Sequence, residues 1–194
     1  MRELYMFPPA NEELLPERSV SYDLTVSQRL LNNRMSLELT FFHIKGDNIV
    51  QVVRIDGKPR NQNVGEFTNK GIEFSLNYMI SNEFSLNANY SYLHMETPIT
   101  GAPGNKFYAG MTYRPGKLTL SAGAQVIDRL YLSTEEDNTL MSDHVLVDAQ
   151  VSYRALKWMD VFVRGDNLLA QKYETMQGFP MPRATMMAGV NLNF

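Results

Sequence analysis

Side chains that could perform chemistry are few in this chain, and their spacing does not suit catalysis. The histidines His43, His94 and His144 lie far apart in the sequence, and none is spaced as a pair of zinc ligands would be. Asp148 and Glu73 fall at polar positions of alternating segments, and neither has a second carboxylate beside it for acid–base work. The chain has no cysteine. The sequence therefore predicts no enzymatic activity, no metal site and no cofactor.

Two charged motifs have simpler explanations than ligand binding. Arg164-Gly165-Asp166 matches a cell-adhesion tripeptide, but short matches of this kind often arise by chance. Glu135-Glu136-Asp137 could offer carboxylates to a cation such as Ca²⁺, although adjacent carboxylates usually form a solvated loop tip. The paired Met186 and Met187 suit an adaptable apolar surface. No residue of the sequence can be assigned to ligand binding on these grounds.

The elements that must position these residues are strands. In residues 184–194, apolar side chains occupy every second position, so one face of an extended chain is apolar and the other is small or polar. Eight earlier segments repeat this alternation. Minimal turns at Asn32-Asn33, Ser81-Asn82 and Pro115-Gly116 join some of them, and longer polar connections join the others. The pattern predicts an all-β fold, an antiparallel meander of about nine strands.

Two further features favour a membrane barrel over a soluble sheet. The polar face is built mainly from Ser, Thr, Asn, Gln and Gly, whereas the outer face of a soluble sandwich is rich in Lys and Glu. Segments of about ten alternating residues have the length of a tilted transmembrane strand. No apolar run of about 18 residues exists, which excludes transmembrane helices. A soluble β protein with a ligand cavity is the remaining all-β alternative.

In such a barrel the apolar face contacts lipid and the polar face lines the lumen. The predicted lipid-facing set includes Phe74, Leu76, Tyr90, Val147, Val151 and Val190. Longer connections are expected at residues 50–62, 96–105, 133–143 and 170–181. They should lie outside the cell, since outer-membrane barrels have short periplasmic turns and longer extracellular loops. The net charge of −3 without a basic block gives no reason to expect a nucleic-acid partner.

Five landmarks occur in a fixed order along the chain. They are Leu14-Leu15-Pro16-Glu17, Asn63-Val64-Gly65 followed by Lys70-Gly71-Ile72-Glu73, the strand from Val147 and Asp148 to Tyr153, Asn167-Leu168-Leu169 with Tyr173, and a closing Pro182-Arg183, Gly189 and Phe194. Together they resemble the C-terminal half of TonB-dependent outer-membrane receptors. The resemblance implies that residues 1–194 are the C-terminal part of the receptor β-barrel, with the plug domain and signal peptide absent.

The resemblance also implies a function and a location. The intact protein would lie in the outer membrane and import a large nutrient, such as a siderophore, a cobalamin or a glycan. Its partners would be outer-membrane lipid, that nutrient, and TonB, which acts through the missing plug. The N-terminal segment has no apolar core of signal-peptide length. A different possibility is a small closed outer-membrane barrel that acts as a diffusion pore or a structural protein.

The end of the chain suggests one further role. In the family that the chain resembles, the barrel-assembly machinery reads a C-terminal strand whose last residue is aromatic. Val190, Leu192 and Phe194 form an apolar row at the end of the last segment, where an aromatic ring suits the membrane interface. These three residues are the candidate assembly signal.

Overall fold

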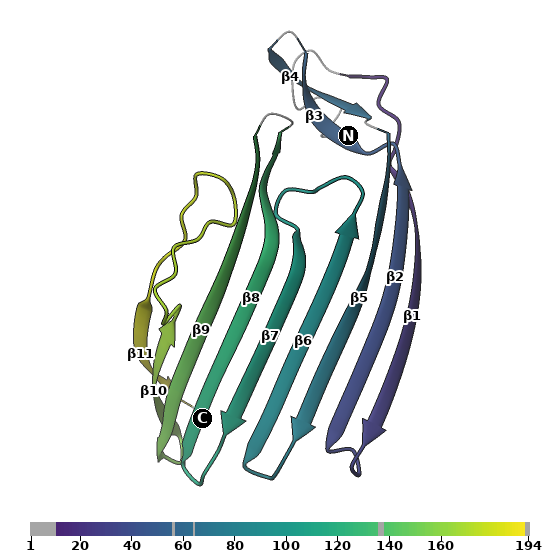
Figure 1. Ribbon diagram of the computed structural model, residues 1–194. Helices are drawn as coiled ribbons and strands as arrows, with labels where there is room; N and C mark the ends of the chain where they lie inside the picture. Colours follow the sequence, from purple (N-terminus) through teal and green to yellow (C-terminus); the bar gives the residue numbers. More distant parts are fainter. Residues whose placement is uncertain (1–10, 56, 64, 136–137, 193–194) are drawn as a thin grey trace.

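The computed structural model describes residues 11–55, 57–63, 65–135 and 138–192. They form eleven strands, nine of which make one antiparallel sheet in the order β1-β2-β5-β6-β7-β8-β9-β10-β11 (Figure 1). None of these residues belongs to a helix long and apolar enough to cross a bilayer. The predicted all-β meander is therefore confirmed.

The strands differ widely in length. Those of the first half are β1 (Arg18–Leu30), β2 (Met35–Asp47), β3 (Val50–Ile55), β4 (Lys58–Asn63), β5 (Glu66–Met79) and β6 (Phe84–Met95). Those of the second half are β7 (Pro103–Tyr113), β8 (Leu118–Glu135), β9 (Asn138–Leu156), β10 (Met159–Asp166) and β11 (Thr185–Leu192). The possible strand before Pro8 lies outside the described residues.

Minimal turns gather at one end of the sheet (Figure 1). The β1–β2 turn needs three consecutive residues with positive φ, and Leu31, Asn32 and Asn33 adopt angles of 53°, 54° and 66°. Asn accepts this conformation more readily than most residues, which is why the Asn pair marks the turn in the sequence. At the β7–β8 turn Gly116 has a φ of 61°. The predicted short turns are confirmed.

Two expected loops are shorter in the structure than the sequence predicted. Residues 133–143 were expected to form a polar loop, but β8 continues to Glu135 and β9 begins at Asn138. Similarly, β7 begins at Pro103, inside the expected loop at 96–105. The alternation that marks membrane strands ends where the lipid ends. The hydrogen-bonded ladder can continue into water, where both faces tolerate polar side chains.

The expected connection at residues 50–62 contains the β3–β4 hairpin, which pairs only with itself. Asn63 fastens the segment before β1 to this hairpin. Its amide nitrogen donates to the carbonyl oxygen of Leu15 at 2.9 Å, and its amide oxygen accepts from the Leu15 nitrogen at 2.8 Å. Two sequence landmarks nearly fifty residues apart therefore meet in one pair of hydrogen bonds.

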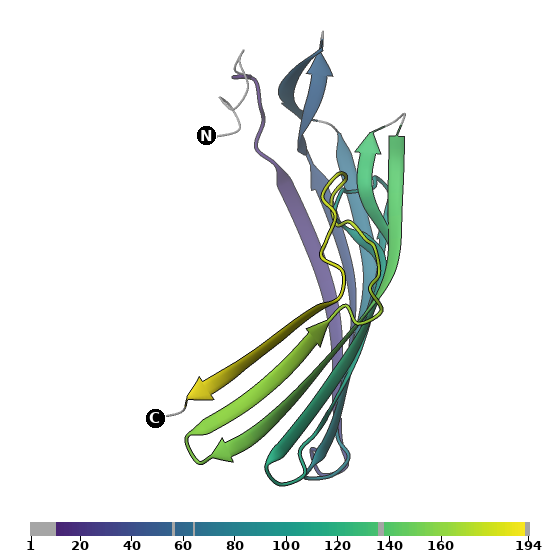
Figure 2. The same cartoon turned by 90° about the vertical axis from the view of Figure 1, so that its left-hand side faces the viewer.

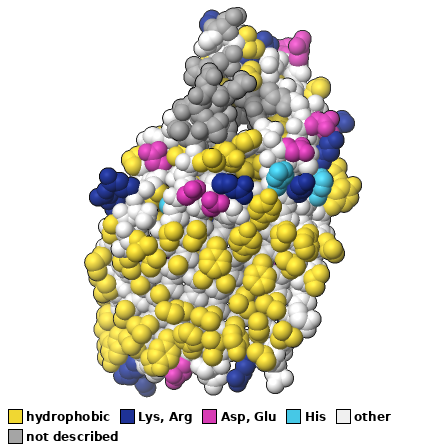
Figure 3. Space-filling model, viewed as in Figure 1, with side chains coloured by type: hydrophobic (Ala, Val, Ile, Leu, Met, Phe, Trp, Pro, Cys, Tyr) yellow, Lys and Arg dark blue, Asp and Glu magenta, His cyan; other side chains and the backbone are white. Residues whose placement is uncertain are grey.

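The sheet is strongly curved, and its register keeps the two faces distinct. Partner residues on adjacent strands share a face, as in the row Leu39, Phe74, Tyr90, Phe107, Val126 and Val145. The convex face is broadly apolar (Figure 3), and the β10–β11 connection lies on the concave side (Figure 2). Every member of the predicted lipid-facing set falls on the apolar face by this register.

Burial is low because the apolar side chains point outward. Among the described residues only Ile127 and Leu130 are buried hydrophobic residues, at 6% and 5% exposure. Large apolar side chains such as Leu24 and Val151 remain 64% and 48% exposed. A soluble sandwich would bury this face in a core, so the sheet needs a lipid solvent on its convex side.

Candidate functional site

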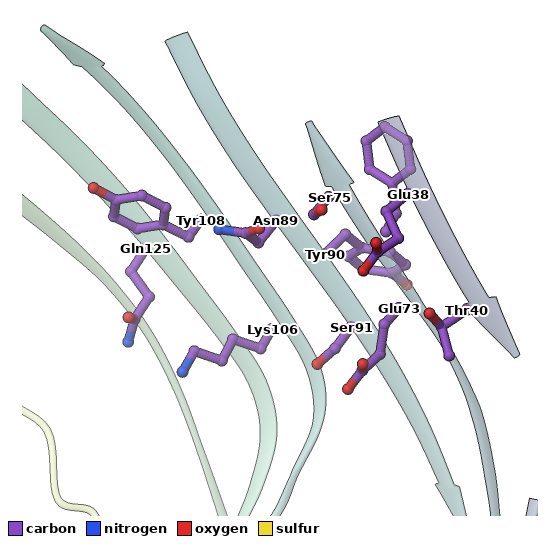
Figure 4. A pocket seen from close by; sticks show the side chains of 11 residues that line it. Glu38, Thr40, Glu73, Ser75, Asn89, Tyr90, Ser91, Lys106, Tyr108 and Gln125 are labelled. Carbon is purple, nitrogen blue, oxygen red and sulfur yellow. The ribbon is translucent and has the colours of Figure 1, made fainter. Parts of the chain in front are cut away.

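The concave face carries a polar groove that runs across five strands. Two cross-strand rows form it, and Figure 4 shows their side chains. One row is Glu38, Ser75, Asn89, Tyr108 and Gln125, and the other is Thr40, Glu73, Ser91 and Lys106. The groove has a volume of about 410 Å³. Because the sheet is a meander, residues nearly ninety positions apart in the chain line one surface.

Charge is divided along the groove. Glu38 and Glu73 lie toward the β2 side, and Lys106 lies on β7. Glu38 accepts a hydrogen bond of 3.0 Å from the Ser27 hydroxyl, and the hydroxyls of Thr25 and Thr40 lie 2.9 Å apart. These groups can bind a polar surface through hydrogen bonds. They supply no nucleophile activated by a base.

Aromatic rings on the same face lie against glycines. A Cβ built on Gly123 would lie 2.8 Å from the Tyr108 hydroxyl, and one on Gly189 would lie 2.6 Å from the Phe162 ring. Gly71 holds the Phe42 ring in the same manner, with a corresponding distance of 2.5 Å. The missing side chains let each ring pack on the backbone instead of standing in the lumen. Sequence reasoning missed these rings. For Phe42 and Phe162 the glycine is the register partner on the next strand, which can be recognised only once the strand pairing is known.

Asn167 anchors the long β10–β11 connection. It is 5% exposed, and its φ is 49°. Its amide nitrogen donates to the carbonyl oxygens of Gln171 at 2.9 Å and Pro182 at 3.2 Å, and its amide oxygen accepts from the Gln171 nitrogen at 3.0 Å. Its backbone nitrogen donates to Asp148 at 2.8 Å. One side chain thus joins both ends of the connection, and its backbone fixes them to β9.

A ring contact holds the middle of this connection. Tyr173 stacks on the buried His144 of β9 with ring centroids 4.4 Å apart. His43 and His94 lie on the opposite, convex face by register. The three histidines therefore do not converge. Within the described ranges no group of three or more His, Cys, Asp or Glu side chains could hold a metal ion.

The other sequence motifs have structural positions. Arg164-Gly165-Asp166 forms the last three residues of β10, and the Arg164 guanidinium binds the Asp166 carboxylate at 2.7 Å. The tripeptide is therefore part of a strand and is not displayed on an extended loop. Residues 136 and 137 of the acidic motif lie outside the described residues. In the candidate assembly signal, Val190 and Leu192 pair with Val161 and Met159 on β10, and Phe194 lies outside the described residues.

Comparisons with known proteins agree with this geometry. The family described as TonB dependent receptor-like, beta-barrel, matches residues 1–168. A curated relative, the probable TonB-dependent siderophore receptor PiuA of Acinetobacter baumannii, is 25% identical over 190 residues. That alignment covers 86% of this chain and 25% of the relative. The chain spans about a quarter of the length of the curated relatives it matches.

Solved structures share the fold at low sequence identity. The siderophore receptor PiuA superposes with a TM-score of 0.76 at 22% identity, covering 90% of this chain and 28% of that one. The ferric-catecholate import receptor Fiu of Escherichia coli gives 0.75 at 16% identity, with 95% and 29% covered. The copper transporter OprC gives 0.77 at 14% identity, with 93% and 32% covered. The chain therefore belongs to the TonB-dependent receptor family and forms part of its outer-membrane β-barrel.

Proposed function

We propose that this chain forms the C-terminal strands of a receptor barrel that imports a large nutrient across the outer membrane, driven by TonB through a plug domain. The observation that carries the proposal is the separation of an apolar convex face from a polar concave face over nine strands, which persists despite register shifts in the β8–β9 and β9–β10 pairs. Such a wall encloses a wide polar lumen only when further strands close it.

A siderophore is the first candidate ligand. PiuA and Fiu are named for siderophore and ferric-catecholate import, and PiuA is a relative in sequence as well as in fold. The fold by itself does not select the ligand, since OprC superposes equally well and is named a copper transporter. Ligand capture would fall to the long connections, and the groove containing Glu73 and Lys106 would face the plug.

The small closed barrel is less well supported. The sheet has β1 at one end and β11 at the other, and all thirteen residues of β1 are exposed. Open strand edges do not persist in lipid. Strands outside this chain would satisfy both edges in a full receptor barrel.

Uptake by cells tests the proposal. Deleting the gene that carries these strands should abolish import of one labelled ferric siderophore from a panel of hydroxamate and catecholate types, and the intact gene should restore it. Loss of the same import in a strain without TonB is the second expected result. Import that persists without TonB would instead indicate a diffusion pore and contradict the proposal.

We infer that Val190, Leu192 and Phe194 form the assembly signal. Val190 and Leu192 lie on the convex apolar face of the terminal strand, which gives the assembly machinery an accessible apolar row. Deleting Phe194 should remove the receptor from the outer membrane while leaving refolding in detergent unchanged, measured by cell fractionation and by heat-dependent gel mobility. Normal membrane insertion of the deletion variant would reduce Phe194 to an ordinary interfacial contact.

A further inference from the structure

The segment before β1 and the β3–β4 hairpin hold each other in one compact unit at the outer end of the sheet (Figure 1). The Asn11 amide nitrogen donates to the carbonyl oxygen of Asn61 at 2.7 Å, and the Asn11 amide oxygen accepts from the backbone nitrogen of Glu13 at 3.2 Å. Both asparagines are buried, at 8% and 6% exposure. The two hydrogen bonds between Asn63 and Leu15 fix the segment to the hairpin at a second point. We call the described residues of 11–17 and 50–63 the outer unit.

The outer unit joins the large sheet through narrow connections. Between β2 and the hairpin Asn48 has a φ of 60°, and between the hairpin and β5 Gly65 has a φ of 70°. The Asn48 nitrogen donates to the Gly65 carbonyl oxygen at 3.0 Å, which closes a neck below the hairpin. On the other side the segment enters β1 directly after Glu17, whose carboxylate accepts from the Val50 nitrogen at 2.7 Å. Among the described residues β3 and β4 pair only with each other, so no ladder ties the outer unit to the nine-stranded sheet.

The three connections lie side by side, which defines a hinge. They continue into β1, β2 and β5, which are neighbouring strands, so their attachment points form a line of two strand spacings, or about 10 Å. A rigid body attached along a line can tilt about that line. Because the line follows the rim of a curved wall, tilting carries the outer unit over the concave side, which is the lumen, or back from it (Figure 2). A Cβ built on Gly65 would meet no described atom within 4 Å, so the neck has room to rotate.

We propose that the outer unit is a hinged flap, which moves as one body about the outer ends of β1, β2 and β5 and tilts over the mouth of the lumen. The hydrogen bonds inside the outer unit keep it rigid, and the neck at Asn48 and Gly65 takes up the rotation. Hinges are typically a few residues at the ends of elements that absorb changes in φ and ψ. The motion requires only the barrel, whereas its use in admitting a nutrient rests on the proposed function. The tests need no ligand, so they stay decisive if the uptake experiment fails.

Hydrogen exchange at single-residue resolution, on the full-length receptor in lipid, tests whether the two parts open together. Asn63→Ala removes three side-chain hydrogen bonds, so the Glu13 amide, which Asn63 does not bind, should exchange at least about tenfold faster. Asn11→Ala should speed exchange of the Leu15 amide in the same way. Gln62→Ala, the matched control on β4, removes none of these bonds and should leave both amides unchanged. Unchanged exchange of Glu13 in Asn63→Ala would show that the two connections open independently, and would overturn the proposal.

Distances between pairs of spin labels test the motion, with heat-dependent gel mobility to show that each variant folds. The labels are attached at Glu13→Cys and Lys58→Cys in the outer unit, and at Glu96→Cys and Met141→Cys on the outer rim of the large sheet, all exposed positions. The Glu13–Lys58 pair and the Glu96–Met141 pair should each give one narrow distance distribution. The Lys58–Met141 pair should give a broad or two-peaked distribution, because β9 lies five strands along the curved sheet from β2. A Lys58–Met141 distribution as narrow as the other two would show a fixed outer unit, and a broad Glu13–Lys58 distribution would show that it is not one body. Either result would reject the flap.

Discussion

Replacing Val147 with arginine is expected to destabilise the folded barrel by about 2–4 kcal/mol. Val147 lies on the convex face of β9, opposite Ala124 on β8, and it lines an apolar depression. Its row is three rows from the row of His43, Lys70 and His94, and three from the row that contains Tyr153. A charge there stands near the bilayer midplane, where the guanidinium has no water and no counter-ion.

The measurement is the denaturant midpoint of the receptor refolded in lipid vesicles, with Gln125→Arg as the matched control. Gln125 lies on β8 beside this position but faces the polar groove. An arginine at position 125 would reach water in the lumen. The substitution should therefore change the free energy of unfolding only slightly, within about 0.5 kcal/mol. Similar destabilisation by both substitutions would show that the two faces are not solvated differently, and would refute the assignment of the lipid face.

Strand positions and faces were predictable from the sequence. Side chains alternate between two faces along a strand, so the apolar residues of each strand show which of its two faces is apolar. Residues such as Phe74 and Val151 therefore fell on the correct face before the register was known. The length of β8 and β9 was not predictable in this way. Beyond the membrane both faces of a strand tolerate polar side chains, so no alternation marks the part of β8 that extends to Glu135.

The concave site was harder to predict, since it is assembled across strands. Glu73 and Lys106 come together only through the β5–β6–β7 register. Nothing near Phe42 in the sequence indicates that its ring lies over Gly71. The sequence landmarks that resemble the receptor family include two asparagines, but they do not indicate what these side chains do. Asn63 and Asn167 prove to be residues whose side chains hydrogen-bond the backbone of a distant or returning segment.

Replacing Asn167 with alanine is expected to lower the free energy of opening the β10–β11 connection by about 2–4 kcal/mol. The substitution removes three hydrogen bonds of the side chain and leaves the Gln171 and Pro182 carbonyls without these donors. It also places alanine at a φ of 49°, a conformation that asparagine tolerates better. Hydrogen exchange of residues 168–184 in the folded receptor measures the effect directly, since local opening exposes these amides.

Two companion substitutions separate the causes. Asn167→Gly relieves the backbone conformation but still removes the side-chain hydrogen bonds, so it should recover only part of the protection. Asn77→Ala, at an exposed position on the concave face of β5, should leave exchange of the connection unchanged. If Asn167→Gly restores full protection, backbone conformation alone governs the connection, and the side-chain hydrogen bonds contribute nothing measurable. If Asn167→Ala itself leaves exchange unchanged, the connection is held by other contacts, of which the stacking of Tyr173 on His144 is the first to remove.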